Sequence, residues 1–113
     1  MKILHYEDIK PTRVEEEKTK GVTVRWLISK EDGAENFAMR FFEIDPGGNT
    51  PLHSHKHEHE VFIIEGEGAV WRNGDEIPIK PGTAVFVPPE ESHCFINNSQ
   101  KKLKFICLIP AHS

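Results

Sequence analysis

The stretch Gly47–Gly66, GGNTPLHSHKHEHEVFIIEG, holds the signals that decide the fold of this chain. Histidines occupy positions 53, 55, 57 and 59, and the apolar run Val61–Ile64 follows almost at once. A neutral imidazole is the commonest metal ligand in proteins near neutral pH. A purification tag also concentrates histidines, but it lies at a chain end and has no strand-like run behind it. The alternating histidines therefore indicate a metal site that adjoins a β-strand.

The composition is that of an ordinary globular domain. The 113 residues are 37% hydrophobic and 28% charged, which suffices for one apolar core. The formal charge of −4 comes with scattered lysines and arginines, so we expect no nucleic-acid partner. No apolar run approaches the ~20 residues that span a bilayer, and charged residues interrupt the N-terminus before a secretory signal forms. The sequence thus predicts a single domain over residues 1–113, located in the cytoplasm and without a membrane partner.

Short alternating segments between turn residues predict a fold made of β-strands. The expected strands are Val22–Ser29, Phe37–Ile44, Glu60–Glu65, Gly68–Arg72, Glu76–Lys80, Ala84–Val87, His93–Asn97 and Leu103–Ile109. We expect Asp45–Gly48 to end the second strand sharply and Asn73–Gly74 to form a type I′ hairpin turn. Pro78 places its strand at a sheet edge. Since no segment has the sustained apolar period of a helix, the prediction is an all-β antiparallel barrel.

Two motifs resemble those of the cupin family, G-x5-H-x-H-x3,4-E-x6-G and G-x5-P-x-G-x2-H-x3-N. The first occupies 47–66 with Gly47, His53, His55, His59 and Gly66, and the second occupies 82–97 with Gly82, Pro88, Glu90, His93 and Asn97. His59 stands in the family's glutamate position, and Glu90 stands in its glycine position, where a positive φ is expected. The resemblance covers about residues 37–110 and implies a single-domain, jelly-roll-like β-barrel.

The resemblance implies that His53, His55, His59 and His93 bind one divalent metal ion. Side chains in an extended strand repeat every two residues, so the first three share one face of the chain. His93 has to come from a second strand across the barrel. Such a site exists only when the chain is folded.

Two alternatives to this ligand set stay open. His57 shares the strand parity of the ligands, and we expect a turn or bulge at Lys56–Glu58 to swing it to the rim instead. Glu60 also fits the glutamate position if the gap has four residues, although its parity is opposite to that of His59. We favour His59 as the ligand.

An all-histidine set resembles the small four-histidine cupins that bind manganese or a similar divalent ion. The resemblance points to Mn, followed by Fe, whereas affinity order alone favours Cu or Ni, and imidazoles also suit Co and Zn. No cysteine stands at a motif position, which argues against a structural zinc site. Because no carboxylate belongs to the set, a bound ion keeps its +2 charge and should attract anionic oxygen ligands.

Strand parity predicts the surroundings of the site. Phe95 and Asn97 are expected to face inward with His93, and Cys94 to lie at the surface or at an interface. Met39, Phe41, Phe62 and Phe86 are expected to line the barrel, as core or as substrate contacts, with Arg40 and Arg72 on the opposite faces. Cys107 is expected to be buried, where it could face the cavity wall.

We consider three functions for such a site. The first is an oxygenase-like metalloenzyme that acts on a small organic substrate, as the resemblance to histidine-rich cupin dioxygenases implies. Its candidate catalytic residues are Glu60 and His57, with Glu43 as a further base. The second is a cupin isomerase or epimerase of sugars or keto acids, for which the expected inward face lacks a cation. The third is a non-catalytic small-molecule-binding module, for which the chain has no evident output segment. We also expect a homodimer, with an N-terminal strand such as Ile3–Tyr6 crossing to the neighbour.

Overall fold

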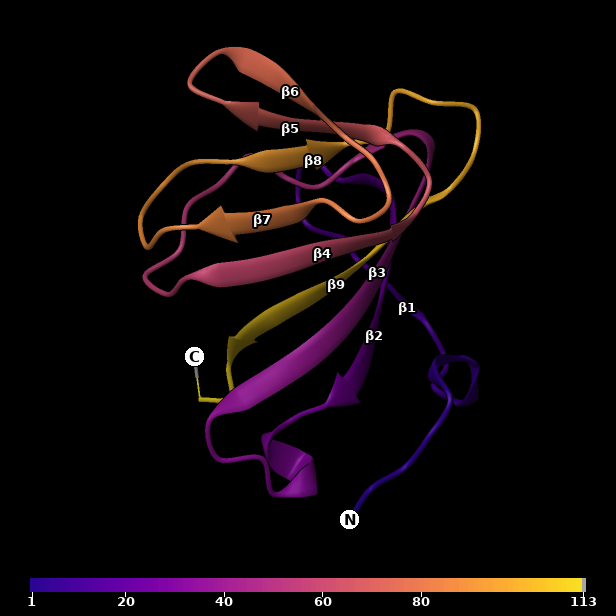
Figure 1. Ribbon diagram of the computed structural model, residues 1–113, viewed down its shortest axis with the longest axis vertical. Coiled ribbons are helices and arrows are strands. Elements are labelled where there is room, and N and C mark those ends of the chain that lie inside the picture. The colour runs from indigo at the N-terminus through magenta and orange to yellow at the C-terminus, as the bar shows by residue number, and fades with distance from the viewer. Residues whose placement is uncertain (113) are drawn as a thin grey trace.

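The computed structural model describes residues 1–112, and most of them belong to one antiparallel sheet (Figure 1). The elements in chain order are η1 (Tyr6–Asp8), β1 (Thr12–Arg13), β2 (Lys20–Ile28), η2 (Lys30–Asp32), β3 (Phe37–Asn49), β4 (His59–Glu65), β5 (Gly68–Arg72), β6 (Asp75–Ile79), β7 (Ala84–Val87), β8 (Cys94–Ile96) and β9 (Leu103–Pro110). The strands pair in the order β6-β5-β8-β3-β9-β4-β7, while β2 pairs with β3 and β1 with β2. Among the described residues, neither 3-10 helix has the length or apolar character that a membrane span requires.

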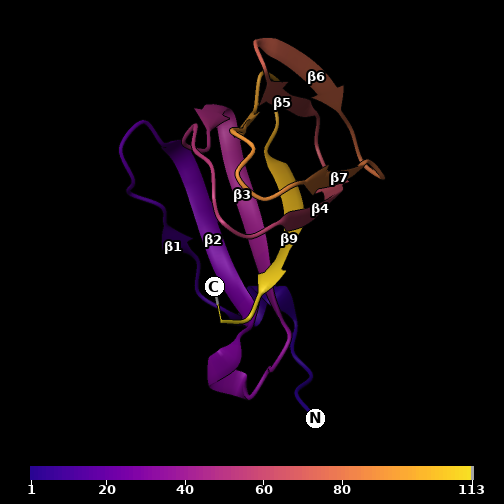
Figure 2. The same ribbon diagram turned by 90° about the vertical axis from the view of Figure 1, so that its left-hand side faces the viewer.

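The sheet is curled into a half-barrel. Figure 2 shows β1, β2 and β3 in one wall and β4 with β7 in the other, and β9 joins the two walls because it pairs with both β3 and β4. The curl gives the sheet a concave face and a convex face. The predicted all-β antiparallel architecture is confirmed, and the concave face holds the apolar core.

Strand alternation explains why the core forms on the concave face. In β9 every second residue is buried, from Leu103 and Phe105 to Cys107 and Ile109. Phe105 is 2% exposed, and its ring stacks on Phe42 at 5.3 Å and on Phe95 at 4.8 Å between centroids. A buried side chain of this size stabilises the fold by about 1.5–3 kcal/mol relative to an exposed one.

The predicted turn at Asp45–Gly48 is wrong, because β3 continues through it to Asn49. Val22 of β2 pairs with Ile44, and Lys20 pairs with Asn49, so four residues of β3 lie opposite Gly21 alone. The extra residues form a bulge that bends the strand without ending it. Backbone hydrogen bonds from Gly47 to the carbonyl of Asn97 and from Asn97 to the carbonyl of Gly48 keep the bulge in the sheet.

The short turns follow the sequence prediction. Asn73 and Gly74 both have positive φ, at 49° and 88°, as a type I′ hairpin turn between β5 and β6 requires. Pro78 lies on β6, which is an edge strand. Glu90 adopts a φ of 71°, the left-handed conformation that glycine adopts more readily. At Gly66, which ends the first motif, a β-carbon would lie 2.2 Å from the carbonyl oxygen of Lys102, so only glycine fits.

The N-terminal segment covers the convex face of the chain's own sheet. The predicted strand Ile3–Tyr6 is absent, because η1 begins at Tyr6. The Tyr6 ring stacks on Phe41 of β3 with centroids 4.5 Å apart. Arg25 of β2 donates a hydrogen bond of 2.8 Å from Nε to the carbonyl of Ile9. The convex side of β2 and β3 is therefore covered by the N-terminal segment. Side chains on that side point away from the histidines.

Candidate metal centre

Two segments that are far apart in the sequence bring the histidines together. His53 and His93 form an isolated antiparallel bridge, with backbone hydrogen bonds of 3.3 and 3.1 Å between them. The backbone N–H of Glu90 donates to the carbonyl of His55 at 2.6 Å, so the left-handed residue of the second motif ties the two segments together. His59 is the first residue of β4. The segment before β4 is thus held against the segment before β8.

The four predicted ligand residues lie in one cluster. The Nε2 atoms of His53 and His55 are 2.7 Å apart, which is close enough for both to approach the same point. Ring centroids are separated by 5.0 Å for His55 and His59, by 5.3 Å for His59 and His93, and by 5.6 Å for His53 and His93. The structure therefore brings all four predicted residues together, from both motifs.

His57 stays beside the cluster. The backbone bends at Lys56 and His57, yet the His57 ring remains half-buried, 5.1 Å from the His55 ring and 5.0 Å from the His59 ring. One ring nitrogen from each of His55, His57 and His59 lies within 4.8 Å of the others. The bend thus leaves His57 at the rim without removing it from reach. His55, His57 and His59 form a second candidate set of ligands.

Burial favours the neutral form of the imidazoles of His53, His55, His57 and His59. Burial, followed by the charge of Arg40, lowers the pKa of His59 from 6.5 to about 3. Burial, followed by the neighbouring His53, lowers the pKa of His55 to about 4. Burial also lowers the pKa values of His53 and His57. Neutral rings carry a free lone pair, which is the form that binds metal.

Two buried contacts orient ring nitrogens toward a common centre. His93 uses Nδ1 for a hydrogen bond of 2.9 Å to the carbonyl oxygen of Glu91, so Nδ1 is the donor and Nε2 keeps the lone pair. His59 Nδ1 lies 3.2 Å from Sγ of Cys107, while His59 Nε2 is buried and has no hydrogen-bond partner among the described residues. A buried nitrogen without a partner is costly unless a ligand binds it. The donor set and this nitrogen fit a divalent ion.

The cluster opens into a pocket of about 270 Å³ on the concave face. Its lining combines four histidines with aliphatic and aromatic walls and a few polar groups: Val14, Glu16, Val22, Val24, Trp26, Arg40, Phe42, Thr50, Pro51, His53, His55, His59, His93, Phe95, Phe105 and Cys107. Phe95 lies inward as predicted, and Cys107 is a buried wall residue. Asn97 is also fully buried, and its amide donates to the carbonyls of Ile44 and Lys101.

The prediction of which β3 face lines the pocket is wrong. Phe41 packs under Tyr6 on the convex side, and neither it nor Met39 lines the pocket. Phe42 and Arg40 point inward instead. Phe62 and Phe86, also predicted to be inward, are exposed on β4 and β7. Strand alternation explains the inward face of β3, because Arg40 and Phe42 share the face of the buried Ala38 and Ile44. The even positions of this strand could have been recognised as inward from that alternation.

Arg40 is the main residue that sequence reasoning placed wrongly. Its Nη2 lies 3.1 Å from Cys107 Sγ and 3.4 Å from His59 Nδ1. Its guanidinium carbon lies 5.4 Å from the centroid of the Trp26 ring and 4.9 Å from that of the Phe42 ring. Arg40 is therefore a cation inside the pocket, next to the histidines.

The remaining candidates lie outside the pocket. Glu60 is exposed and alternates with the buried His59, so its side chain faces away from the rings. Cys94 is buried on β8 opposite Trp71, although a surface position was expected, and it does not line the pocket. Glu43 lies in a pair with Arg25. Among the base candidates, His57 is thus the one beside the predicted metal ligands.

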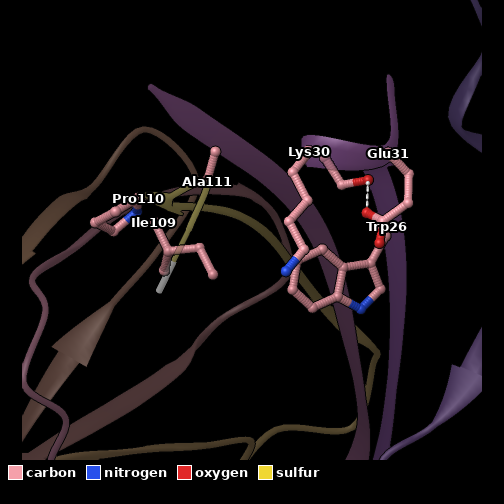
Figure 3. Close-up of a pocket in the computed structure, with 7 residues that line it drawn as sticks. Trp26, Lys30, Glu31, Ile109, Pro110 and Ala111 are labelled. Carbon is pink, nitrogen blue, oxygen red and sulfur yellow. Dashed lines mark hydrogen bonds between the residues drawn. The ribbon is translucent and has the colours of Figure 1, made fainter. Parts of the chain in front are cut away.

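A second cavity, of about 450 Å³, continues along the concave face (Figure 3). Trp26 lines both cavities. In β9, Phe105 and Cys107 line the first cavity, and Ile109, the next inward residue, lines the second. Lys30 and Glu31 of η2 form its polar side. The two cavities therefore share Trp26 as a lining residue.

Known proteins with similar sequences and structures include a family of domains, several enzymes and a binding protein. Residues 40–109, which include both histidine segments, match the family described as a cupin domain. An oxalate-binding protein from Thermotoga maritima is 36% identical over 91 residues, covering 78% of this chain and 74% of that protein. An L-ectoine synthase from Desulfatibacillum aliphaticivorans is 30% identical over 95 residues, covering 79% of this chain and 71% of that protein. The structure of the polyketide cyclase RemF from Streptomyces resistomycificus has a TM-score of 0.93 and 35% identity, over 98% of this chain and 80% of that one.

Proposed function

This chain belongs to the cupin domain family, and from that premise we propose that it is a divalent-metal-dependent enzyme acting on a small organic molecule. One observation carries the proposal. Four imidazoles line one pocket, and the buried Nε2 of His59 has no hydrogen-bond partner within residues 1–112. Buried polar atoms are nearly always satisfied, so this nitrogen is best explained by a ligand.

His53, His55, His59 and His93 are the residues that would hold the ion. Their resemblance to four-histidine cupins favours Mn, then Fe, with Ni, Cu, Co and Zn as further candidates. A bound divalent ion would supply Lewis acidity, polarising an oxygen atom of the substrate. Cys107 and the carbonyl of Glu91 would orient the rings of His59 and His93 by holding their Nδ1 atoms.

Non-oxidative chemistry at a carbonyl or enol oxygen is the reaction class that the geometry supports best. An isomerase or epimerase needs a cation near the substrate. Arg40 meets this need because it lies in the pocket, on the face that the sequence prediction had left without a cation. A cation beside the ligands stabilises negative charge that develops on the substrate. His57, at the rim, is the candidate for moving a proton. Two of the relatives described above are named as a synthase and a cyclase, which agrees with this class, and the third is named only for binding oxalate.

An oxygenase-like reaction is the second candidate. It is favoured by the ligand set without a carboxylate and by the aromatic and aliphatic walls, which keep water from a reactive centre. Glu60 contributes little in either case, because it is exposed on the other side of β4.

The first part of the test is metal analysis. Protein purified without a nickel column, then dialysed against Mn, is expected to bind one ion per chain. The variant His93→Ala should lose that ion, and the variant His5→Ala, whose ring lies in the N-terminal segment, should keep it. Equal Mn binding by His93→Ala and wild type would contradict the proposed site.

The second part separates the reaction classes. Mn-loaded protein is incubated with 2-oxo acids, 1,3-diketones, phenols and thiols, with and without O₂, and products are followed by mass spectrometry. Turnover without O₂ supports carbonyl chemistry, and turnover that consumes O₂ supports the oxygenase. Binding without turnover would make the protein a binding module.

The homodimer and the cytoplasmic location also belong to this proposal. Light scattering at the monomer mass of 12.9 kDa would contradict the dimer. Cell fractionation tests the location.

A further inference from the structure

Arg40 is a pocket cation without an acidic partner. Within residues 1–112 it forms no ion pair; its Nη2 donates to Cys107 Sγ and lies 3.4 Å from His59 Nδ1. Its Nε is buried and has no hydrogen-bond partner. Removing a guanidinium from water costs free energy that a nearby anion normally offsets.

The pocket supplies no such anion of its own. Glu16 is the one carboxylate among the described residues that line it, and its side chain is 62% exposed, 3.7 Å from His53 at the rim. A metal ion in the histidine cluster would add further positive charge. An organic ligand that carries negative charge would therefore offset the positive charge of Arg40 and of the metal ion.

Neighbouring side chains hold the guanidinium of Arg40 in a position from which it can bind a ligand. Trp26 and Phe42 contact it through their rings, and Cys107 accepts one of its hydrogen bonds. These contacts fix the position of the charge without neutralising it. A planar guanidinium held in this way suits a planar carboxylate, which it can bind through two parallel hydrogen bonds.

We propose that the ligand of this pocket is an organic carboxylate with a flat, apolar body, and that Arg40 binds its carboxylate group. Part of this inference rests on the proposed function, namely that the reacting oxygen of the same molecule lies at the histidine cluster. The aromatic rings of Trp26, Phe42 and Phe95 supply flat walls for the body. A phosphate ester fits less well, because Arg40 is the one lysine or arginine that lines the pocket. The cavity beyond Trp26 gives room for a longer body.

The test uses a pair of probes that differ in the carboxylate. Phenylpyruvate and phenylacetone share a benzyl ketone, and only the first is an anion. Each is titrated calorimetrically into metal-free and Mn-loaded wild type, Arg40→Met, Arg40→Lys and Arg72→Met. Arg72 is exposed at the end of β5, so its substitution is the matched loss of a surface cation.

We expect wild type to bind phenylpyruvate more tightly than phenylacetone in both metal states. Arg40→Met should weaken phenylpyruvate binding about 10- to 100-fold and leave phenylacetone binding unchanged, since a hydrogen bond to a charged group is lost. Arg40→Lys should give an intermediate value, because it keeps the charge and loses the fork. Arg72→Met should behave as wild type.

Failure of this inference can be told apart from failure of the proposed function. Phenylpyruvate affinity that is unchanged in folded Arg40→Met overturns the inference, and so does a wild type that does not prefer phenylpyruvate. Lack of Mn binding by wild type overturns the proposed function, while the metal-free titrations still test Arg40. If Arg40→Met does not fold, as judged by circular dichroism, Arg40→Gln replaces it, because the amide keeps a donor for Cys107.

Discussion

Arg25 and Arg40 lie on the neighbouring strands β2 and β3, but on opposite faces of the same sheet. Each guanidinium contacts an aromatic ring, Arg25 that of Tyr6 at 5.3 Å and Arg40 that of Phe42 at 4.9 Å. They differ in their acidic partners. Arg25 pairs with Glu43 and also donates to a backbone carbonyl, whereas Arg40 pairs with no carboxylate within residues 1–112. The charge of Arg25 is thus offset by the chain itself, whereas the charge of Arg40 is the one that we propose a ligand offsets.

Composition alone could not identify the pocket, because the two faces of β3 carry similar residues. Both faces carry aromatic residues, Phe41 on the convex side and Phe42 on the concave side. Phe41 is buried only because the N-terminal segment folds over it. A face that the chain itself covers is structural, while an apolar face left open beside histidines and an arginine without an ion pair in residues 1–112 is a candidate binding site.

The largest expected difference between the faces concerns stability. Phe105→Ala removes a ring from the centre of the concave core and should lower the free energy of unfolding by about 3–5 kcal/mol. Phe86→Ala, at a side chain that is 59% exposed, should change it by no more than about 0.5 kcal/mol. Urea denaturation measures both. Similar losses in the two variants would show that the concave core does not hold the fold together.

The two arginines should also differ in their contribution to stability. Arg25→Met leaves the buried carboxylate of Glu43 with only Lys102, 3.7 Å away, so we expect a loss of about 3 kcal/mol. Arg40→Met removes an unpaired cation and should change stability by about 1 kcal/mol or less, in either direction. The same denaturation experiment decides. If Arg40→Met is the more damaging variant, Arg40 is a structural residue and the comparison fails.

A smaller effect is expected from the thiol that contacts His59. Cys107→Ala removes the atom 3.2 Å from His59 Nδ1, and loss of a group that orients a metal ligand typically lowers metal affinity about 10- to 100-fold. Cys94→Ala is the matched control, because that buried thiol does not line the pocket. Competition with a fluorescent chelator measures the Mn affinity of both. Equal affinities would remove Cys107 from the site.

The smallest expected effect is the pH dependence of the metal-free protein. The folded-state pKa values of His59 and His55, about 3 and about 4, lie below the unfolded value of 6.5, so the folded protein binds fewer protons. This contribution to stability is fully present above pH 6.5 and is lost as the pH falls toward 4. Solvent screens the half-buried His55 ring, so we expect a total loss on the order of 1 kcal/mol. Denaturation curves from pH 7 to pH 4.5 that show no decline would contradict it.

Much of the fold could be predicted because its signals are local. Alternation, the turn at Asn73–Gly74 and the edge position of Pro78 depend on neighbouring residues, and β5 and β7 lie within the predicted bounds. The bulge at Asp45–Gly48 could not be predicted, because hydrogen bonds to the distant Asn97 keep it in the sheet. The inward direction of Arg40 depends on which face of β3 the N-terminal segment covers, and that is also a long-range fact.

The candidate site divides in the same way. Motif spacing predicted that His53, His55, His59 and His93 would come together, and the structure clusters them. Spacing did not predict that Cys107 would hold His59, since the two residues meet only because β4 pairs with β9. Strand parity alone does not place His57. The backbone bends near it, yet its ring stays beside those of His55 and His59.

The most direct test of the account is a crystal structure of the protein grown with Mn, with the ion located by its anomalous signal. We predict one ion per chain, coordinated by ring nitrogens of His53, His55, His59 and His93, with His57 outside the coordination sphere. An ion held by His55, His57 and His59 without His93 would contradict this prediction, because the site would then not require the second motif. No ion in the cluster at saturating Mn would contradict metal chemistry in this pocket altogether.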